Sequence, residues 1–425
     1  MSNRFNESFM LKEKPCRRWI VWWIASAFYL YELVLRVSPS VMTEGLMSSF
    51  NATSTLIGIL VSFYYYSYTI LQLPCGVIID KLGVKNLLLS SAFLCVIGSC
   101  LFASAEKIYI AQIGRFLIGA GSACAFISCL QIATDLFTKK YFVILVGITN
   151  VMGTLGGLLG GFPIAKLVNT MGWQNTTYVL ASIGIIILIL ILVFIPNNLK
   201  KSSVDKEKNS SVSGNIVGLL KNHQIVLSGV ISGLMYLPIS AFAELWIVPF
   251  FMTKHGIDNE TASTAAAIIF VGIAIGSIVL AMSARKLGGY MRTLRLSSLS
   301  TAIMFFVLIF CSDSMTLSLV IVFIIGFLTG AQPICFTCAK NNASSDLSGT
   351  ALALTNCIIM SIGAIFQPSI GALLDTFWNG IISENGMRVY DIMCYRFAIL
   401  TIPVSLIVSY IISFFVKETI NLEDE

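Results

Sequence analysis

The segment Gly76-Val-Ile-Ile-Asp80-Lys81-Leu-Gly83-Val-Lys85 is a short polar stretch, punctuated by glycine, between two long apolar runs. It stands out because only 11% of the 425 residues are charged, whereas 56% are hydrophobic. A bilayer core of about 30 Å takes roughly 20 apolar residues per helix, and backbone groups inside it must be hydrogen-bonded within the protein. The apolar runs are far too long for barrel strands of about 10 residues. The sequence therefore predicts an all-α membrane protein in which this segment forms a turn between two membrane-spanning helices.

The apolar runs predict twelve membrane-spanning helices in two bundles of six. They fall near residues 19–43, 54–79, 86–105, 107–133, 141–166, 174–195, 225–252, 261–284, 293–312, 315–338, 349–374 and 394–416. The longest polar interval, rich in lysine, serine and asparagine, divides the chain into two halves. We therefore expect a tail over residues 1–18, a bundle over 19–195, a linker over 196–224, a second bundle over 225–416 and a tail over 417–425.

Basic residues are distributed unevenly between the two sides of the predicted membrane. Most of the 27 lysines and arginines fall on the side that holds the tails and the linker. The opposite side holds only Lys107, Lys166, Lys254, Arg388 and Arg396. Because short loops rich in Lys and Arg stay in the cytoplasm, both termini are expected there. The net charge of +6 is explained by these helix ends, so no nucleic-acid partner is expected. Short loops and compact termini favour a bacterial inner membrane, with a lysosome-like membrane as the alternative.

The eleven cysteines are scattered, and most lie inside apolar runs. They are expected to be small core residues rather than a disulfide framework. Cys335 and Cys338 have CxxC spacing but no second pair, so no metal site is expected. Nothing resembles a catalytic triad or a phosphate loop. The sequence therefore predicts neither an enzyme nor a bound cofactor.

The two halves resemble each other at one fixed offset. A shift of 205 residues places Lys81-Leu-Gly83 on Lys286-Leu-Gly288. The same shift pairs Pro163 with Pro368, Gly121 with Gly326 and Tyr31 with Tyr236. Internal repeats around a midplane site are typical of secondary transporters. We therefore expect a pseudo-repeat that relates the two bundles.

The opening segment fits the signature between spans two and three of the major facilitator superfamily. Arg115-Phe-Leu-Ile-Gly119-Ala-Gly121 resembles the fourth-span motif of that superfamily, whose arginine is tied to coupling. The resemblance covers nearly the whole chain. It implies a two-bundle, gradient-driven transporter that works by alternating access. It also implies a cytoplasmic gate made by Gly76, Asp80, Lys81, Gly83 and Lys85.

Two further stretches indicate which branch of the superfamily this sequence resembles. Drug antiporters of the superfamily carry a Gly-Pro pair within a fifth-span glycine run, but here Pro163 comes late, which disfavours efflux. The stretch 29–42, Tyr-Leu-Tyr-Glu-Leu-Val-Leu-Arg-Val-Ser-Pro-Ser-Val-Met, is similar to a branch with lysosomal dipeptide transporters and amino-acid transporters of intracellular bacteria. That branch implies an amino acid or a short peptide as the substrate.

Ionisable residues inside spans each cost about 2.5–3.5 kcal/mol on insertion scales and call for a partner or a function. Glu32 lies about 20 Å from the inner face, and Arg115 about 10 Å below the outer face, at a rise of about 1.5 Å per residue. In a core of about 30 Å these depths coincide. We therefore expect Glu32 and Arg115 to pair, with Glu32 as the proton-coupling group. The alternative is a permanent ion pair that only fixes helix packing.

Arg36 and Glu244 are expected to bind the substrate. Arg36 can bind a carboxylate through two parallel hydrogen bonds, and Glu244 can bind an ammonium, so together they suit a zwitterion. The alternative places both at the outer rim, in contact with water. Tyr31, Tyr236, Gln131, Asn150 and Asn356 are expected to complete the site, although helix-to-helix hydrogen bonding also explains in-span amides.

Glycines at four-residue spacing in span five, Gly153, Gly157 and Gly161, are expected to let helices approach closely. The predicted function is thus proton-coupled transport of a small polar solute by a monomer in a lipid bilayer. Uptake of an organic anion and efflux are the alternatives within transport. A membrane sensor, or a subunit that stabilises a partner, is the alternative from another class.

Overall fold

The computed structural model describes residues 15–197, 218–344, 347–383 and 386–417. The first half consists of α2 (Pro15–Val37), η1 (Ser38–Val41), α3 (Thr43–Phe50), α4 (Ser54–Gln72), α5 (Cys75–Leu82), α6 (Val84–Ala103), α7 (Ile108–Ser122), α8 (Ala125–Leu136), α9 (Lys139–Gly160) and α10 (Phe162–Phe194). The second half consists of α12 (His223–Leu237), the π-helix η2 (Pro238–Trp246), α13 (Ile247–His255), α14 (Asn259–Ser283), α15 (Tyr290–Phe310), α16 (Met315–Thr329), α17 (Ile334–Asn341), α18 (Ser348–Thr376), α19 (Ile392–Ile399), α20 (Thr401–Ile412) and η4 (Ser413–Phe415).

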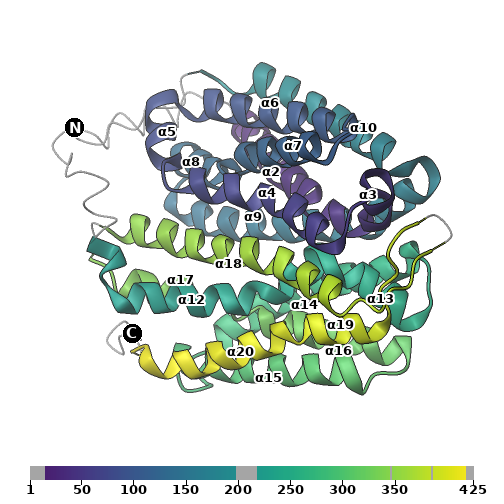
Figure 1. Ribbon diagram of the computed structural model, residues 1–425. Coiled ribbons are helices and arrows are strands. Elements are labelled where there is room, and N and C mark those ends of the chain that lie inside the picture. The colour runs from purple at the N-terminus through teal and green to yellow at the C-terminus, as the bar shows by residue number, and fades with distance from the viewer. Residues whose placement is uncertain (1–14, 198–217, 345–346, 384–385, 418–425) are drawn as a thin grey trace, which may run out of the picture.

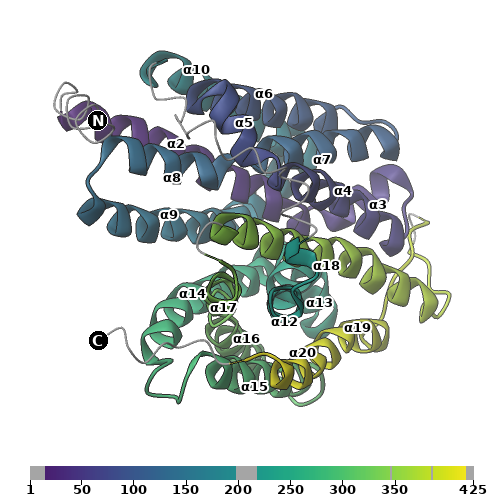
Figure 2. The same cartoon turned by 90° about the vertical axis from the view of Figure 1, so that its left-hand side faces the viewer.

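The helices form two bundles that lie side by side, one from each half of the chain (Figures 1 and 2). Among the described residues, eleven helical runs are long and apolar enough to cross a membrane. One of these, Ile144–Phe194, has 51 residues, which at about 1.5 Å per residue is far more than a bilayer needs. It turns at Gly172, whose φ is 81°, and therefore contains two passes. The prediction of twelve spans in two bundles is confirmed.

Twelve passes place the start of α2 and the end of α20 on the same side of the membrane. We call this the termini side; α5, α17 and the start of α12 also lie there (Figure 1). The opposite side, with α3, α13 and the start of α19, is called the far side. These names carry no assignment to a cellular compartment.

The sequence predicted a turn over the whole polar opening segment, but most of the segment is helical. Its first residues are helical, because Ile78 and Gly83 donate backbone hydrogen bonds to Pro74 and Ile79, each 2.9 Å long. The chain turns only at Gly83, whose φ of 76° favours glycine. Gly288, the repeat partner of Gly83, also has a positive φ, 92°. The predicted repeat is thus visible in backbone geometry as well as in sequence.

Several spans are interrupted, and two interruptions bring cysteines together. Cys75 begins α5 after the break at Pro74, and Cys124 precedes α8 after the end of α7. The two form a disulfide, with their Cα atoms 5.9 Å apart. The expectation of small core cysteines rather than a disulfide framework does not cover this single pair, because sequence alone did not reveal that the two helix breaks are adjacent.

The two halves make close backbone contact on the far side, where α18 runs beside α4 (Figures 1 and 2). A Cβ added to Gly58 would lie 2.6 Å from the Cα of Pro368. A Cβ added to Gly371 would lie 2.3 Å from the carbonyl oxygen of Ser54. Glycine at both positions therefore allows α4 and α18 to meet without intervening side chains.

Candidate functional site

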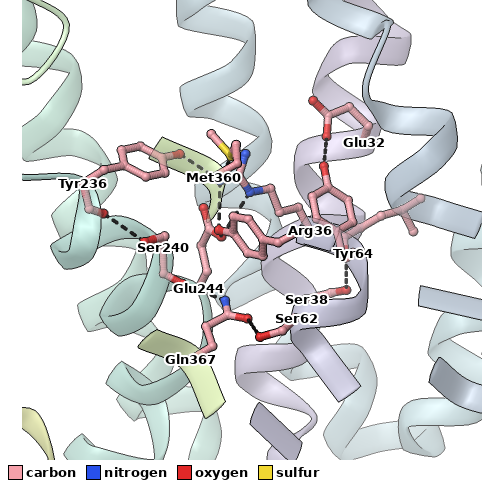
Figure 3. A network of polar contacts seen from close by, with 12 residues as sticks. Glu32, Arg36, Ser38, Ser62, Tyr64, Tyr236, Ser240, Glu244, Met360 and Gln367 are labelled. Atoms are coloured by element: carbon pink, nitrogen blue, oxygen red, sulfur yellow. Dashed lines mark hydrogen bonds and ion pairs between the residues drawn. The ribbon is translucent and has the colours of Figure 1, made fainter. Parts of the chain in front are cut away.

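A buried ion pair, here called the central pair, joins the two halves of the chain (Figure 3). Arg36, at the end of α2, donates from Nε to Oε2 of Glu244 in η2 over 3.0 Å. Their side chains are only 5% and 1% exposed. The prediction that these residues belong to one site agrees with this geometry, but they bind each other directly, and neither lies at a hydrated rim.

Glu244 is positioned by an unusual stretch of helix. The π-helix η2 begins at Pro238, which has no backbone N–H to donate into the preceding turn. Short π-helical segments are rare and are often found at functional sites. Gln367 of α18 supports the segment, because its Nε2 donates to the Ser240 carbonyl over 2.7 Å and its own carbonyl accepts from Trp246 over 3.2 Å.

Tyrosines surround the Arg36 guanidinium. Its Nη2 donates to the hydroxyls of Tyr65 over 2.9 Å and Tyr236 over 3.0 Å. The Tyr65 hydroxyl in turn donates to Oε2 of Glu244. The guanidinium carbon also lies 4.9 Å from the centre of the Tyr65 ring, a cation–π distance. Met360 of α18 completes the surround, with its sulfur 3.7 Å from Nη2.

Glu32 and Arg115 do not form the ion pair that the sequence predicted. Oε2 of Glu32 accepts from the Tyr64 hydroxyl over 2.8 Å. Nη1 of Arg115 donates to the Leu35 carbonyl over 2.8 Å, and its guanidinium carbon lies 5.1 Å from the centre of the Tyr64 ring. The depths estimated for Glu32 along α2 and for Arg115 along α7 agree with their shared position beside Tyr64. Depth could not show that an aromatic ring from a third helix lies between them.

The four charged residues form a balanced cluster with unused hydrogen-bonding atoms. Glu32, Arg36, Arg115 and Glu244 are all at most 4% exposed, and when ionised they carry two charges of each sign. Oε1 of Glu244 and both Nε and Nη2 of Arg115 have no hydrogen-bond partner among the described residues. Buried polar atoms are nearly always hydrogen-bonded, so these atoms indicate a place where a polar ligand can bind.

Several residues predicted to bind substrate lie away from this cluster. The Tyr31 hydroxyl faces Gly184 of α10, where an added Cβ would lie 2.4 Å from it. Gln131 donates within α8 to Asp135 over 3.0 Å. Asn150 is exposed on α9. Of the five additional residues, Tyr236 joins the cluster directly, and Asn356 lies close by, beside the Tyr68 hydroxyl.

The predicted gate is described only in part. The surroundings of Gly76 and the side chain of Asp80 lie outside what the structure describes. Lys81 is exposed. Lys85 donates to the carbonyl of Leu192 over 2.9 Å and so ties the start of α6 to the end of α10. The role of this segment as a gate stays a prediction.

The fifth-span glycines differ in how closely they pack. An added Cβ would lie 2.8 Å from the Tyr29 ring at Gly153 and 2.6 Å from the Phe270 ring at Gly157. At Gly161 the nearest atom would be 3.5 Å away, which is an ordinary contact. Gly156, which does not belong to the four-residue pattern, packs more tightly. A Cβ added there would lie 2.4 Å from the Leu30 carbonyl oxygen. Close packing is thus present at Gly153 and Gly157 but not at Gly161.

Comparison with known proteins identifies the family in which this architecture is found. The Major Facilitator Superfamily family model matches residues 23–368. The uncharacterized transporter YybO of Bacillus subtilis is 23% identical over 61% of this chain and 64% of its own length. The probable sulfoacetate transporter SauU of Cupriavidus necator is 23% identical over 41% of each chain. The chain thus spans less than two thirds of these curated relatives.

A similar fold is found among solved structures. A bacterial homolog of the human lysosomal transporter Spinster, in an inward-facing and unoccupied conformation, superposes with a TM-score of 0.76. It is 14% identical, and the match covers 95% of this chain and 97% of that chain. At this identity the likeness concerns the fold alone. Together with the family match over most of the sequence, it shows that the chain belongs to the Major Facilitator Superfamily, a superfamily of membrane transporters and not of enzymes.

Proposed function

We propose that this protein moves a small zwitterion, an amino acid or a short peptide, across a membrane by alternating access. The observation that carries this proposal is the Arg36–Glu244 ion pair, which lies within the membrane and joins the two halves. A zwitterion presents the same two charges as this pair. Its carboxylate can replace Glu244 at a guanidinium, and its ammonium can replace Arg36 at the carboxylate.

The unused atoms of the cluster support binding of such a ligand. Arg36 already directs its Nε and Nη2 atoms at protein partners. Arg115, in contrast, keeps two donor atoms without a partner, and Glu244 keeps one acceptor atom. A ligand that binds both residues can form hydrogen bonds with these three atoms. Each such charge-assisted bond contributes about 1.5–3 kcal/mol.

We further propose that Glu32 takes up the coupling proton, with Arg115 acting through Tyr64 rather than by direct contact. Tyr64 donates to Glu32 and lies under the Arg115 guanidinium, so it connects the two. Burial and a nearby guanidinium act in opposite directions on the proton affinity of a carboxylate. Opening the site to water changes both influences together, which is what coupling requires.

The remaining features of the proposal follow from the sequence. The distribution of Lys and Arg supports cytoplasmic termini, and the short loops favour location in a bacterial inner membrane. The segment from Gly76 to Lys85 would then act as a gate on the cytoplasmic side. We propose a monomer that requires only its substrate, protons and lipid.

The test is counterflow in proteoliposomes. Vesicles preloaded with unlabelled amino acids or dipeptides are diluted into trace labelled substrate, and exchange is measured without any proton gradient. We expect exchange with free zwitterions and at least a tenfold loss when the carboxylate is amidated or the amine is acetylated. If neutral or purely anionic solutes exchange equally well, zwitterion recognition is refuted.

Coupling is tested separately with Glu32→Gln. This change should abolish uphill uptake driven by an inward proton gradient while counterflow continues. Retention of uphill uptake at the wild-type level would refute the role of Glu32. The same comparison separates a transporter whose coupling is lost from one that has failed to fold.

Transport of an organic anion is the second candidate. It is favoured by the two unpartnered donors of Arg115, and SauU carries the name of a transporter for such a solute. Counterflow with sulfonates and dicarboxylates, but not with zwitterions, would support it. Absence of exchange with every class of solute would instead favour a sensor or a partner-stabilising subunit.

A further inference from the structure

The far-side end of α18 and the segment that follows it reach across to the other half. Asp375, in the last turn of α18, accepts hydrogen bonds at Oδ2 from the Thr55 backbone N–H over 2.9 Å and from the Thr55 hydroxyl. Tyr390 donates its hydroxyl proton to Oδ1 of Asp375 and accepts from the backbone N–H of Ser54 over 3.2 Å. The two donors across this contact, Ser54 and Thr55, are the first two residues of α4 in the first half.

These bonds complete the N-terminus of α4. The first backbone N–H groups of a helix have no partner within it and need a cap. Thr53 caps α4 locally, because its side chain accepts from Leu56 over 3.4 Å and its carbonyl accepts from Ile57 over 3.0 Å. The N–H groups of Ser54 and Thr55 are capped from the other half. The carboxylate also lies at the positive end of the helix dipole, where a negative charge is favoured.

The segment after α18 is built to hold these groups in place. Ile382 and Arg388 form an antiparallel bridge, and Val389 donates to the Ile381 carbonyl over 3.0 Å. Arg388 lies 4.4 Å over the Trp378 ring and donates to Oδ1 of Asp375 over 3.3 Å. Burial, with the hydrogen bond to Asp375, raises the pKa of Tyr390 above its ordinary value. The phenol therefore stays protonated and able to donate at neutral pH.

We propose that Asp375, Arg388 and Tyr390 form a far-side clamp on the N-terminus of α4, which holds the far side closed and must release before that side opens. The proposal rests on alternating access but not on the identity of the substrate. Release exposes two backbone N–H groups and one carboxylate together, and water can then solvate all of them. The clamp is thus suited to a reversible switch, because Asp375 and Arg388 are already partly exposed, at 15% and 36%.

The experiment measures distances in nanodiscs without substrate. Spin-labelled amino acids are introduced genetically, so that the native cysteines remain. One pair replaces Glu106 and Asp313, exposed residues in far-side loops of the two halves; a second replaces Thr138 and Ser344, exposed on the termini side. Pulsed EPR then gives the populations open on each side for the wild type and for the variants Asp375→Asn and Tyr390→Phe.

Asp391→Asn is the matched control. This carboxylate belongs to the same segment, but it caps α19 through the Cys394 N–H over 2.9 Å and binds Asn379, so its bonds stay within the second half. We expect Asp375→Asn to increase the ratio of far-side-open to far-side-closed molecules about tenfold, the effect of losing one charge-assisted hydrogen bond. Tyr390→Phe should increase it severalfold, with Asp391→Asn unchanged.

Unchanged far-side distances in both clamp variants would overturn the proposal. A lower melting temperature in those variants with no shift in the distances would overturn it too, since the contacts would then be merely structural. If Asp375→Asn does not fold, Tyr390→Phe carries the test, because it retains the carboxylate. The readout needs no transported solute, so a failure of the zwitterion assignment leaves it interpretable.

Discussion

Two ion pairs, one at the centre and one on the far side, show how differently this protein uses charge. Arg36 and Glu244 are 3.0 Å apart, with side chains 5% and 1% exposed. Arg388 and Asp375 are 3.3 Å apart, with side chains 36% and 15% exposed. The first pair takes one residue from each half and so joins the halves directly. The second lies within one half, and Asp375 contacts the other half by accepting from the backbone N–H and the hydroxyl of Thr55.

The difference in burial shows which atoms of each pair contribute to stability. Removing two charges from water costs several kcal/mol per ion, so the central pair is retained at a cost to stability and requires its tyrosine surround. A solvent-exposed pair contributes only about 0–1 kcal/mol. On the far side the arginine is therefore secondary, and the carboxylate acts mainly as a helix cap.

The largest effect is expected from breaking the central pair. Glu244→Gln leaves two buried arginines, Arg36 and Arg115, with only one carboxylate, Glu32, and should reduce the free energy of unfolding by about 3–5 kcal/mol. Arg388→Met removes the corresponding partner on the far side and should cost no more than about 1 kcal/mol. Denaturation of both variants in the same detergent measures the contrast, and equal losses would refute it.

A double replacement separates the structural role of the central pair from its function. Arg36→Met with Glu244→Leu removes both charges and should recover most of the stability lost in Glu244→Gln, because an apolar pair needs no solvation. Counterflow should nevertheless remain at background. A stable double variant that still exchanges substrate would show that the pair is only a packing element.

A second, somewhat smaller effect is expected where the halves meet on the far side. Gly371→Ala places a methyl group 2.3 Å from the Ser54 carbonyl, and such overpacking costs about 1–3 kcal/mol. Gly349→Ala is the control on the same helix, because no atom lies within 4 Å of its added Cβ. It should be neutral or stabilising by up to about 1 kcal/mol. Thermal denaturation of both variants tests the contact.

An effect of similar size should come from the tyrosine between Glu32 and Arg115. Tyr64→Phe removes the hydroxyl that donates to Glu32 and should cost about 1.5–3 kcal/mol of local interaction. We expect lower proton-driven accumulation with counterflow retained, measured in the same vesicles. Tyr66→Phe is the control, because Tyr66 is 37% exposed on the same helix. Equal accumulation in both variants would exclude a coupling role for Tyr64.

Substitutions at the termini-side turns are expected to have the smallest effect on stability. They should nevertheless change the transport rate. Asp80→Asn should slow transport much more than Arg285→Ala, because the second copy of the segment has kept its glycine and lysine but lost the acid. Initial rates of counterflow at matched protein levels test this. Equal slowing in both variants would contradict an asymmetric gate.

The fold was largely predictable because membrane-length apolar runs and positive-φ glycines such as Gly83 leave few alternatives. The buried charges were predictable for the same reason, since each stands out in an apolar run. The residues that bind these charges could not be predicted. Depth along a helix gives one coordinate, whereas pairing depends on helix rotation and on residues from third helices, such as Tyr64 and Tyr65.

Other features gave no sequence signal of their own. The π-helical register that places Glu244 depends on support from Gln367, 123 residues later than Glu244. Met360 resembles any other apolar residue of its span. Asp375 and Tyr390 lie near the end of a span and in a loop, where polar residues are ordinary, so their contact with α4 could be found only in three dimensions.

The cap on α4 has a consequence for how the protein is assembled. The N–H groups of Ser54 and Thr55 find their partners 336 and 320 residues later in the chain. During synthesis, the first bundle is therefore made long before one of its helices can be completed. The two halves repeat each other in sequence, yet the N-terminus of α4 receives part of its cap from the loop before the last span and from the helix that precedes it.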